Sequence, residues 1–418
     1  MRGMSSSVSE LAKAARRASR AVALASSETK DRALRNVAEL LRGASAQIAE
    51  ANARDLEAGR GQLSAPMLDR LRMDPKITEA TARGVEQVIA LPDPIGSRGA
   101  MQRRPNGILV GRQRVPLGVI AMIYESRPNV TIDAASLCLK SGNAVLLRGG
   151  KEAGHTNQVL GQILGAALSA AGLPAEAVQV VPAADRESVK ELLSLSGLID
   201  LAIPRGGEGL VRFVSENARV PVIQHYQGVN HLFLDRDAEL EMATALAVNG
   251  KAQRPATCNA LECLLVHAEA AERLLPGVAA ALFEKGVELR GDPRSRELVP
   301  AMRPAADDDF GREFLDKILA VRVVADFDAA LEHIGRYGSN HSESICTGSY
   351  ANAQRFLREV DASCVLVNAS TRLNDGGELG LGCEIGTATS KLHAYGPMGL
   401  ESLTTEKWIV LGEGQVRG

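Results

Sequence analysis

Gly107-Ile-Leu-Val-Gly-Arg-Gln-Arg-Val-Pro-Leu-Gly-Val-Ile-Ala-Met-Ile123 is the stretch of sequence that decides the fold. Its first half, up to Val115, alternates apolar and charged residues, which predicts an exposed strand. Its second half, from Pro116, is continuously apolar and predicts a buried strand of a parallel sheet. The stretch marks the point where a helical beginning changes into alternating strands and helices.

Amphipathic helices are predicted before this stretch, because apolar residues recur three and four apart from Val8 to Arg60. After it, apolar strands alternate with helical segments. The predicted helices run from Asn129 to Lys140, Glu152 to Ala171, Ser188 to Leu195, Leu240 to Val248, Ala270 to Glu284, Phe327 to Tyr337 and Ala351 to Val360. The predicted strands run from Ala144 to Leu147, Val178 to Val181, Leu198 to Ile203, Pro221 to Ile223, Leu261 to Val266, Ala320 to Val324, Ser344 to Thr347 and Cys364 to Asn368.

This alternation predicts an α/β fold with two doubly wound, Rossmann-like parallel sheets. We place their boundary near Gly228, with a first domain over residues 1–227, interrupted by a strand over residues 105–115, and a second over residues 228–400. A last strand, Glu406-Lys-Trp-Ile-Val-Leu411, lies in residues 401–418 and has no obvious local partner. Because unpaired strands tend to pair with another chain, we expect a homo-oligomer.

Composition narrows the class of ligand. The chain has 418 residues, a formal net charge of -2 and 23% charged residues, and its cations are scattered, which argues against a nucleic-acid partner. No apolar run reaches the roughly 20 residues that span a bilayer. We therefore expect a cytoplasmic protein with no membrane partner and a small ligand.

The six cysteines of the chain are too few for a disulfide framework, and neither they nor the histidines show zinc-site spacing, so no metal is predicted. Three of them, Cys138, Cys263 and Cys364, lie in apolar contexts typical of buried packing. Cys258 lies in a polar segment with Lys251 and Arg254 nearby, and cations near a thiol favour the nucleophilic thiolate. Cys258 is therefore the candidate nucleophile, and Cys383, in a glycine-rich loop, is the alternative.

Two glycine clusters follow predicted strands, Arg148-Gly-Gly-Lys151 and Arg205-Gly-Gly-Glu-Gly209. Ligands of open parallel sheets bind at the carboxyl ends of strands, where glycine lets the backbone approach phosphate. Together the clusters predict dinucleotide binding, although neither is a GxGxxG motif. Tyr124-Glu-Ser-Arg-Pro-Asn129 also opens a helix, and Arg127 there is either an anion ligand or part of a surface salt bridge.

Taken together, these segments resemble the gamma-glutamyl phosphate reductase family, a divergent branch of the aldehyde dehydrogenase superfamily. The resemblance is carried by Arg114 to Ile120, Tyr124 to Thr131, Leu137 to Val145, Ile203 to Gly207, Gln253-Arg-Pro-Ala-Thr-Cys-Asn259, Val367 to Arg372, Asp375 to Gly377 and Lys391-Leu-His-Ala-Tyr-Gly-Pro-Met-Gly-Leu400. The Cys258 segment and the last segment distinguish this branch from ordinary aldehyde dehydrogenases.

The resemblance implies reduction of L-glutamate 5-phosphate by NADPH to the semialdehyde, a step of proline synthesis, with Cys258 as the nucleophile that forms a thioester. It implies that Arg148, Gly149, Gly150 and Lys151 lie near the adenosine ribose, Arg205, Gly206 and Gly207 at the pyrophosphate, and Glu313 at the nicotinamide ribose. The substrate contacts predicted with it are Arg127, Asn129, Arg254 and His393. It also implies that residues 107–115 and 406–411 form an oligomerisation arm, and we predict transient coupling to glutamate 5-kinase.

The sequence departs from ordinary aldehyde dehydrogenases at two places. The turn that carries their oxyanion asparagine reads Glu-Ser-Arg-Pro128 here, so the Cys258 backbone N–H and Asn129 are the substitute donors we consider. The segment that carries their deacylating glutamate reads Gln224-His-Tyr-Gln-Gly-Val-Asn-His231, which has no carboxylate. We therefore expect hydrolysis of the thioester to be slow, with a substitute base at His225 or His231 as the alternative. Asn230, where relatives often have cysteine, is assigned no function.

Two rival functions remain open. One is a hydrolytic aldehyde dehydrogenase acting on another small aldehyde, and the other is a non-enzymatic nucleotide-binding oligomer.

Overall fold

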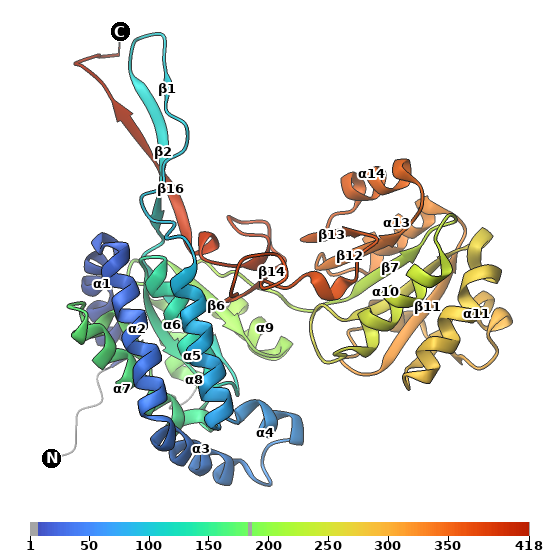
Figure 1. The fold of residues 1–418 in the computed structure, drawn as a ribbon, viewed down its shortest axis with the longest axis horizontal. Coiled ribbons are helices and arrows are strands. Elements are labelled where there is room, and N and C mark those ends of the chain that lie inside the picture. Colours follow the sequence, from blue (N-terminus) through green and yellow to red (C-terminus); the bar gives the residue numbers. More distant parts are fainter. Residues whose placement is uncertain (1–6, 183–185, 418) are drawn as a thin grey trace.

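The structure is a computed structural model that describes residues 7–182 and 186–417. It contains two α/β units and a narrow antiparallel arm that projects from the first unit and carries the C-terminal end of the chain (Figure 1). The two doubly wound units predicted from the sequence are therefore confirmed. No helix among the described residues is long and apolar enough to cross a membrane.

The predicted helical beginning is confirmed. It forms α1 (Val8–Leu24), α2 (Ser27–Gly43) and α3 (Ser45–Gly59), and two further helices, α4 (Ala65–Leu71) and α5 (Pro75–Ala90), follow. Ser7, Ser26 and Asp74 each accept a hydrogen bond from a backbone N–H in the first turn of α1, α2 and α5, which satisfies donors that a helix leaves unpaired. The apolar faces of these helices join the core of the first sheet.

The first sheet is parallel and has the strand order β5-β4-β3-β6. Its strands are β3 (Val119–Tyr124), β4 (Ala144–Arg148), β5 (Val178–Val180) and β6 (Leu201–Arg205), and its helices are α6 (Asn129–Lys140), α7 (Gly154–Ala170), α8 (Arg186–Ser194) and α9 (Glu208–Asn217). All of β3 is buried, as its continuous apolar run predicts. The predicted strand at Pro221 to Ile223 is wrong, because only one isolated bridge, Ala202 to Val222, forms there.

The second sheet is parallel throughout and has the order β10-β9-β11-β8-β7-β12-β13. Its strands are β7 (Asn230–Leu234), β8 (Leu261–His267), β9 (Glu288–Gly291), β10 (Arg303–Pro304), β11 (Ile318–Val324), β12 (Ser342–Cys346) and β13 (Cys364–Val367). Its helices are α10 (Leu240–Ala252), α11 (Ala268–Glu284), α12 (Pro293–Leu298), α13 (Phe327–Tyr337) and α14 (Tyr350–Glu359). The sequence analysis missed β7, although this strand is central and fully buried.

The arm consists of β1 (Gln102–Arg103), β2 (Leu109–Pro116) and β16 (Thr404–Leu411). β16 pairs with β2 over its whole length, from Thr404 opposite Pro116 to Leu411 opposite Leu109. The expectation that the last strand lacks a local partner is therefore wrong, because two segments almost three hundred residues apart meet in the arm.

The chain returns to the first unit before residue 400, the predicted end of the second domain. The short hairpin of β14 (Gly386–Ala388) and β15 (Gly396–Met398) belongs to this return. Buried residues from Ile385 to Leu403 pack in the core of the first sheet, whereas those of the second sheet's cores lie between Leu232 and Val360.

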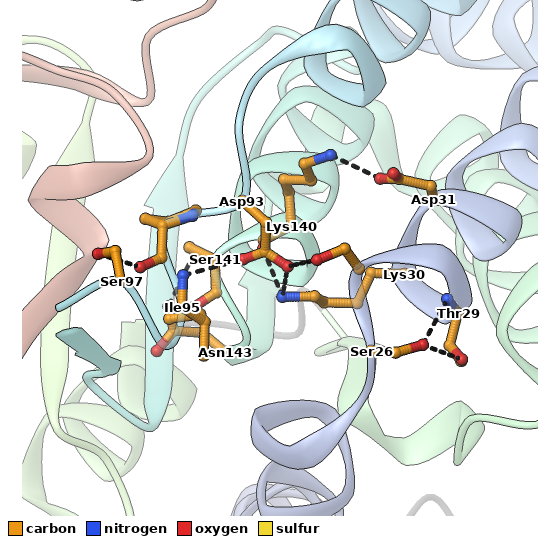
Figure 2. A network of polar contacts seen from close by, with 12 residues as sticks. Ser26, Thr29, Lys30, Asp31, Asp93, Ile95, Ser97, Lys140, Ser141 and Asn143 are labelled. Atoms are coloured by element: carbon orange, nitrogen blue, oxygen red, sulfur yellow. Dashed lines mark hydrogen bonds and ion pairs between the residues drawn. The ribbon is translucent and has the colours of Figure 1, made fainter. Parts of the chain in front are cut away.

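A buried polar network fixes the helical beginning and the arm to the first sheet (Figure 2). Lys30, 1% exposed, pairs with Asp93 at 2.5 Å, and Lys140, 2% exposed, pairs with Asp31 at 2.6 Å. Asn143 accepts from the Gly118 N–H and donates to the Leu403 carbonyl, both at 2.8 Å. Removing one partner of a buried ion pair costs about 3–5 kcal/mol, so the network holds together segments that the hydrophobic core alone does not align.

Candidate active site

The amino ends of three neighbouring strands of the second sheet bring together Asn230, Cys258 and His341. Asn230 begins β7, Cys258 lies three residues before β8, and His341 lies one residue before β12, and β7 lies between β8 and β12 in the sheet. Parallel neighbours start at the same edge of a sheet, so residues far apart in sequence meet there. The sequence predicted Cys258 at this place but assigned nothing to His341.

The Asn230 side chain joins these three strands. Its amide nitrogen donates to the carbonyl oxygens of Cys258 at 2.8 Å, Ala260 at 2.6 Å and Gly228 at 3.1 Å. Its amide oxygen accepts from the Ser342 N–H at 3.1 Å, next to His341. Asn230 is fully buried, so these backbone groups depend on its side chain, and not on solvent, for their hydrogen bonds. The residue to which no function was assigned holds the nucleophile's peptide in place.

A second support reaches the nucleophile turn from Arg372, which the sequence analysis noted only as part of a motif. Its guanidinium donates to Thr257 Oγ1 at 3.0 Å, to Gln253 Oε1 at 2.9 Å and to Asn259 Oδ1. The Asn259 amide nitrogen in turn donates to the Asn374 carbonyl at 3.0 Å. Both neighbours of Cys258 are thereby tied to the segment after β13.

Gly228 lies against the same turn. A Cβ atom at this position would overlap the Cys258 carbonyl, so only glycine allows the approach. The Gly228 N–H donates to Glu313 Oε1 at 3.0 Å. Glu313, predicted at the nicotinamide ribose, therefore lies beside the nucleophile turn.

Burial raises the pKa of the Cys258 thiol to about 11; Arg205 opposes this shift, whereas Glu384 and Glu313 add to it. The expectation that Lys251 favours the thiolate is wrong, because Lys251 forms a buried ion pair with Glu262 at 2.6 Å. The thiol is thus protonated in this structure, and its reaction requires a change in its surroundings or a proton acceptor.

Several arginines lie near the thiol or near one another. Burial lowers the pKa of Arg127 to about 10, and Arg205, Arg70 and Arg254 lower it further, while Cys258 raises it. Burial and Arg254 also lower the pKa of Arg372. Because these charges act on one another, Arg127 and Arg254, both predicted substrate contacts, lie in one cationic group with Arg205. Such a group is suited to binding an anion with more than one charge.

Arg205 lies at the predicted strand end of β6, and its side chain has partners in the segment that returns to the first unit. Its guanidinium donates to the Ile385 carbonyl at 3.2 Å and lies 3.7 Å from Glu384 Oε1. Because its charge acts on Cys258 and Arg127, the side chain faces the nucleophile, whereas Gly206 and Gly207 continue toward α9.

Two predicted substrate contacts form bonds elsewhere. The Asn129 amide nitrogen donates to Asp133 Oδ2 at 2.9 Å, one helical turn further on. The exposed His393 ring lies 2.9 Å from the Ser402 carbonyl, near the start of β16. Neither hydrogen bond shows the side chain facing Cys258, so the substrate-binding roles of Asn129 and His393 stay predictions.

The predicted cofactor residues lie at the carboxyl ends of β4 and β6, where the sequence placed them. Arg148 ends β4, and the exposed Lys151 follows the buried pair Gly149 and Gly150. A Cβ atom at Gly149 would meet the Asn157 side chain and the Tyr124 ring. Gly207 faces open space where its Cβ would be, and its N–H donates to Glu125 Oε2 at 3.0 Å at the start of α9.

The two candidate bases differ in position. His231 is fully buried, and its Nδ1 lies 2.9 Å from Glu343 Oε2, within a separate cluster with Cys263 and His333. One ring nitrogen of His225, by contrast, lies within 4.8 Å of the Cys258 sulfur and of His341. Of the two candidate bases, only His225 therefore lies close enough to act at Cys258.

Cys383, the alternative nucleophile, packs against the core of the first sheet. Burial raises the pKa of its thiol to about 12, and the Asp133 charge adds to this shift. Its thiol is therefore harder to ionise than that of Cys258.

A family model described as the aldehyde dehydrogenase family matches residues 1–312, and the chain belongs to this family. It is accordingly an oxidoreductase. Its relatives in the family include gamma-glutamyl phosphate reductases that match over nearly the full length. The one from Sorangium cellulosum is 63% identical over 97% of both chains, and the one from Anaeromyxobacter is 57% identical over 99% of this chain and 98% of its own. The crystal structure of the Thermotoga maritima reductase is 43% identical, with a TM-score of 0.97 over 99% of this chain and 100% of its own.

We predict that Asn230→Ala slows alkylation of Cys258 by iodoacetamide and lowers kcat at least tenfold, because the carbonyls of Cys258 and Ala260 lose their shared donor. Each unpaired buried group also costs about 1–3 kcal/mol of stability. The measurement is the rate of carboxamidomethylation at Cys258 by mass spectrometry, alongside steady-state kinetics.

The matched control is Asn52→Ala. Asn52 is also buried, and it donates to the Leu71 carbonyl and accepts from the Met73 N–H, both at 2.8 Å, among the N-terminal helices. This variant is expected to lose stability but to keep the alkylation rate. Equal alkylation rates in wild type and Asn230→Ala would show that the amide does not position the nucleophile.

Proposed function

We propose that this chain reduces L-glutamate 5-phosphate with NADPH to L-glutamate 5-semialdehyde and phosphate, the second step of proline biosynthesis from glutamate. The observation that carries the proposal is a buried cysteine thiol whose turn is held by Asn230 and Arg372, with Arg205 and Arg127 close enough to interact with it electrostatically and Arg254 close enough to act on Arg127. An acyl phosphate with an α-carboxylate presents two anionic ends, and guanidinium groups bind both phosphate and carboxylate. The names of the full-length relatives support the same substrate.

In the proposed reaction, the Cys258 thiol gives up its proton to the departing phosphate as the sulfur attacks the acyl carbon, the bond to the phosphate oxygen breaks, and hydrogen phosphate leaves. The product is a thioester of Cys258. The nicotinamide cofactor supplies the hydride that takes this thioester to the oxidation level of the aldehyde. Collapse of the thiohemiacetal then breaks the carbon–sulfur bond, and the sulfur takes up a proton again.

The chain's own residues fit such a cofactor. The carboxyl ends of β4 and β6 are where parallel sheets bind nucleotides, and Gly207 offers open space at the start of α9. Lys151 is exposed after β4 and is the residue we propose near a 2′-phosphate, which is the group that distinguishes NADPH from NADH. Glu313, next to Gly228, is proposed to hold the nicotinamide ribose near Cys258.

We further propose that the chain acts in the cytoplasm as a homo-oligomer, with transient coupling to glutamate 5-kinase. The supporting observation is the arm, whose outer strand β16 exposes the side chains of Trp408, Val410 and Leu411 and has a partner on one edge only. Exposed apolar strands favour pairing with another chain. A monomer in sedimentation velocity would contradict the oligomer.

The experiment that tests the function is a coupled assay with glutamate, ATP and a glutamate kinase, in which NADPH oxidation and semialdehyde formation are followed together. We expect equal amounts of both, slower turnover with NADH, and no turnover by Cys258→Ala, which still binds NADPH. Cys383→Ala is the matched control and should remain active. Turnover by Cys258→Ala would contradict the assignment of the nucleophile.

In the oxidative direction we predict that the enzyme requires inorganic phosphate. The segment of residues 224–231 lacks the carboxylate that activates water in hydrolytic relatives, and a positioned general base contributes on the order of 10²–10⁴ in rate. Phosphate is already an anionic nucleophile and needs no such base. The measurement is NADPH formation from semialdehyde and NADP with and without phosphate.

Sustained oxidation over many turnovers in phosphate-free buffer would overturn this prediction and favour the hydrolytic rival. The His225→Asn and Glu313→Gln variants would then identify the base, because both side chains lie beside the nucleophile turn.

A further inference from the structure

Three metal-ligating side chains meet at the nucleophile. The Cys258 sulfur and one ring nitrogen each of His225 and His341 all lie within 4.8 Å of one another. They come from three separate segments, which are the turn before β8, the segment before β7 and the start of β12. The two imidazole rings lie 4.7 Å apart between centroids and are tilted by 52°.

Two imidazole nitrogens in this group are buried without a hydrogen-bond partner, namely His225 Nδ1 and His341 Nε2. Buried polar atoms are nearly always paired, and leaving one unpaired costs about 1–3 kcal/mol. The His341 ring is 0% exposed, and its Nδ1 lies 2.7 Å from Ser342 Oγ, which fixes its orientation. Each histidine of this group therefore has a buried ring nitrogen that no other group in the described residues pairs with.

Burial lowers the pKa of His225 to about 4, and Arg205 adds to the shift. Burial also lowers the pKa of His341, and His225 adds to this shift. Burial therefore favours the neutral imidazole at both positions, which is the form that binds a metal.

We propose that Cys258, His225 and His341 form a binding site for a thiophilic divalent cation of the zinc class, which blocks the nucleophile reversibly. Zinc binds cysteine sulfur and histidine nitrogen at about 2.0–2.3 Å in a tetrahedron. Ligand atoms at the corners of such a tetrahedron lie about 3.4–3.7 Å apart, so side-chain movements of about 1 Å close the site. Three protein ligands leave a fourth position for water or an anion.

Binding is a ligand exchange without oxidation or reduction. The thiol loses its proton to the buffer, the sulfur forms a bond to the metal, and the two ring nitrogens donate their lone pairs. The metal-bound sulfur cannot attack an acyl phosphate, so the bound cation inhibits the enzyme.

Charges around the site act in both directions. The guanidinium groups of Arg205 and Arg127 disfavour a cation, whereas Glu313 and Glu384 favour it, since all four groups act electrostatically with Cys258. The thiolate formed on binding cancels one charge of the metal. An anion in the fourth position, held by the arginines, would cancel another.

A second cluster, His231, Cys263 and His333, also gathers three ligating side chains, but its chemistry is different. Arg322 Nη1 lies 3.2 Å from His333 Nδ1. Because a guanidinium only donates, the neutral His333 ring carries its proton on Nε2, which faces Cys263 Sγ at 3.5 Å. That nitrogen has no lone pair for a metal, so the proposal is confined to the Cys258 site.

The test uses the full chain, reduced and freed of metal with a chelator, without substrate or cofactor. We expect calorimetric titration with Zn²⁺ to give one site per chain and about one released proton, and Co²⁺ to give a thiolate-to-cobalt charge-transfer band. Cys258→Ala should abolish the band, and His225→Asn should weaken Zn²⁺ binding at least tenfold. His341→Asn should weaken it similarly, but His225→Asn is the variant less prone to misfold, because His225 is only partly buried whereas His341 is fully buried.

The matched control is His155→Asn, because the His155 side chain is 56% exposed and pairs with Asp55 far from the nucleophile. It should bind Zn²⁺ as wild type does. A charge-transfer band that survives Cys258→Ala and disappears in Cys263→Ala would overturn the proposal in favour of the second cluster. Absence of Zn²⁺ binding in wild type would overturn it outright, and neither result depends on turnover, so the proposed reduction is tested separately.

Discussion

The hydrogen bonds of the buried Asn230 amide are the constraint on which the active site depends. One side chain binds the carbonyls of Cys258 and Ala260 and the backbone N–H of Ser342, so it fixes the nucleophile turn relative to β7 and β12. Arg372 holds the same turn from its other side through Thr257 and Asn259. A nucleophile fixed in this way loses little freedom when it reacts, and such positioning is a large part of catalysis.

The chemistry of the site follows from what surrounds this fixed turn. Burial raises the pKa of the Cys258 thiol, while Arg127 and Arg205 of the first unit and Arg254 of the second supply the charge that an acyl phosphate needs. Arg205 ends β6 at the carboxyl edge of the first sheet, and Cys258 lies at the amino edge of the second. The two units therefore supply different parts of one reaction, and the ion pairs of Lys30 with Asp93 and of Lys140 with Asp31 tie α2 to α6 and to the segment after α5 (Figure 2).

Much of the fold could be predicted from the sequence, because local periodicity determines most of its elements. The helices Asn129–Lys140 and Phe327–Tyr337 have the predicted bounds, since each combines a helical apolar period with clear ends. β7 was missed because His231 interrupts a short apolar run, and only the structure shows that Glu343 pairs with this histidine inside the sheet. Local sequence does not specify the pairing of β16 with β2, because the two strands are so distant in the chain, and only the family resemblance placed both segments in one arm.

The residues of the candidate site that lie in recognisable motifs, such as Cys258 and Arg127, could be predicted from the sequence. Those that reach the site only through the packing of distant segments could not. The sequence analysis looked for ligands at the carboxyl ends of strands and so had no reason to select Asn230 or His341, which lie at amino ends. The prediction that Lys251 favours the Cys258 thiolate was wrong because Lys251, on α10, pairs with Glu262 on the following strand, β8.

The account's central claim, that Cys258 carries the acyl group, is tested most directly by the intact mass of the protein incubated with glutamate, ATP and a glutamate kinase without reduced cofactor. The account predicts a γ-glutamyl adduct on the Cys258 peptide, sensitive to hydroxylamine, with one phosphate released per adduct. Phosphate release without an adduct, or an adduct on the Cys383 peptide, would contradict it.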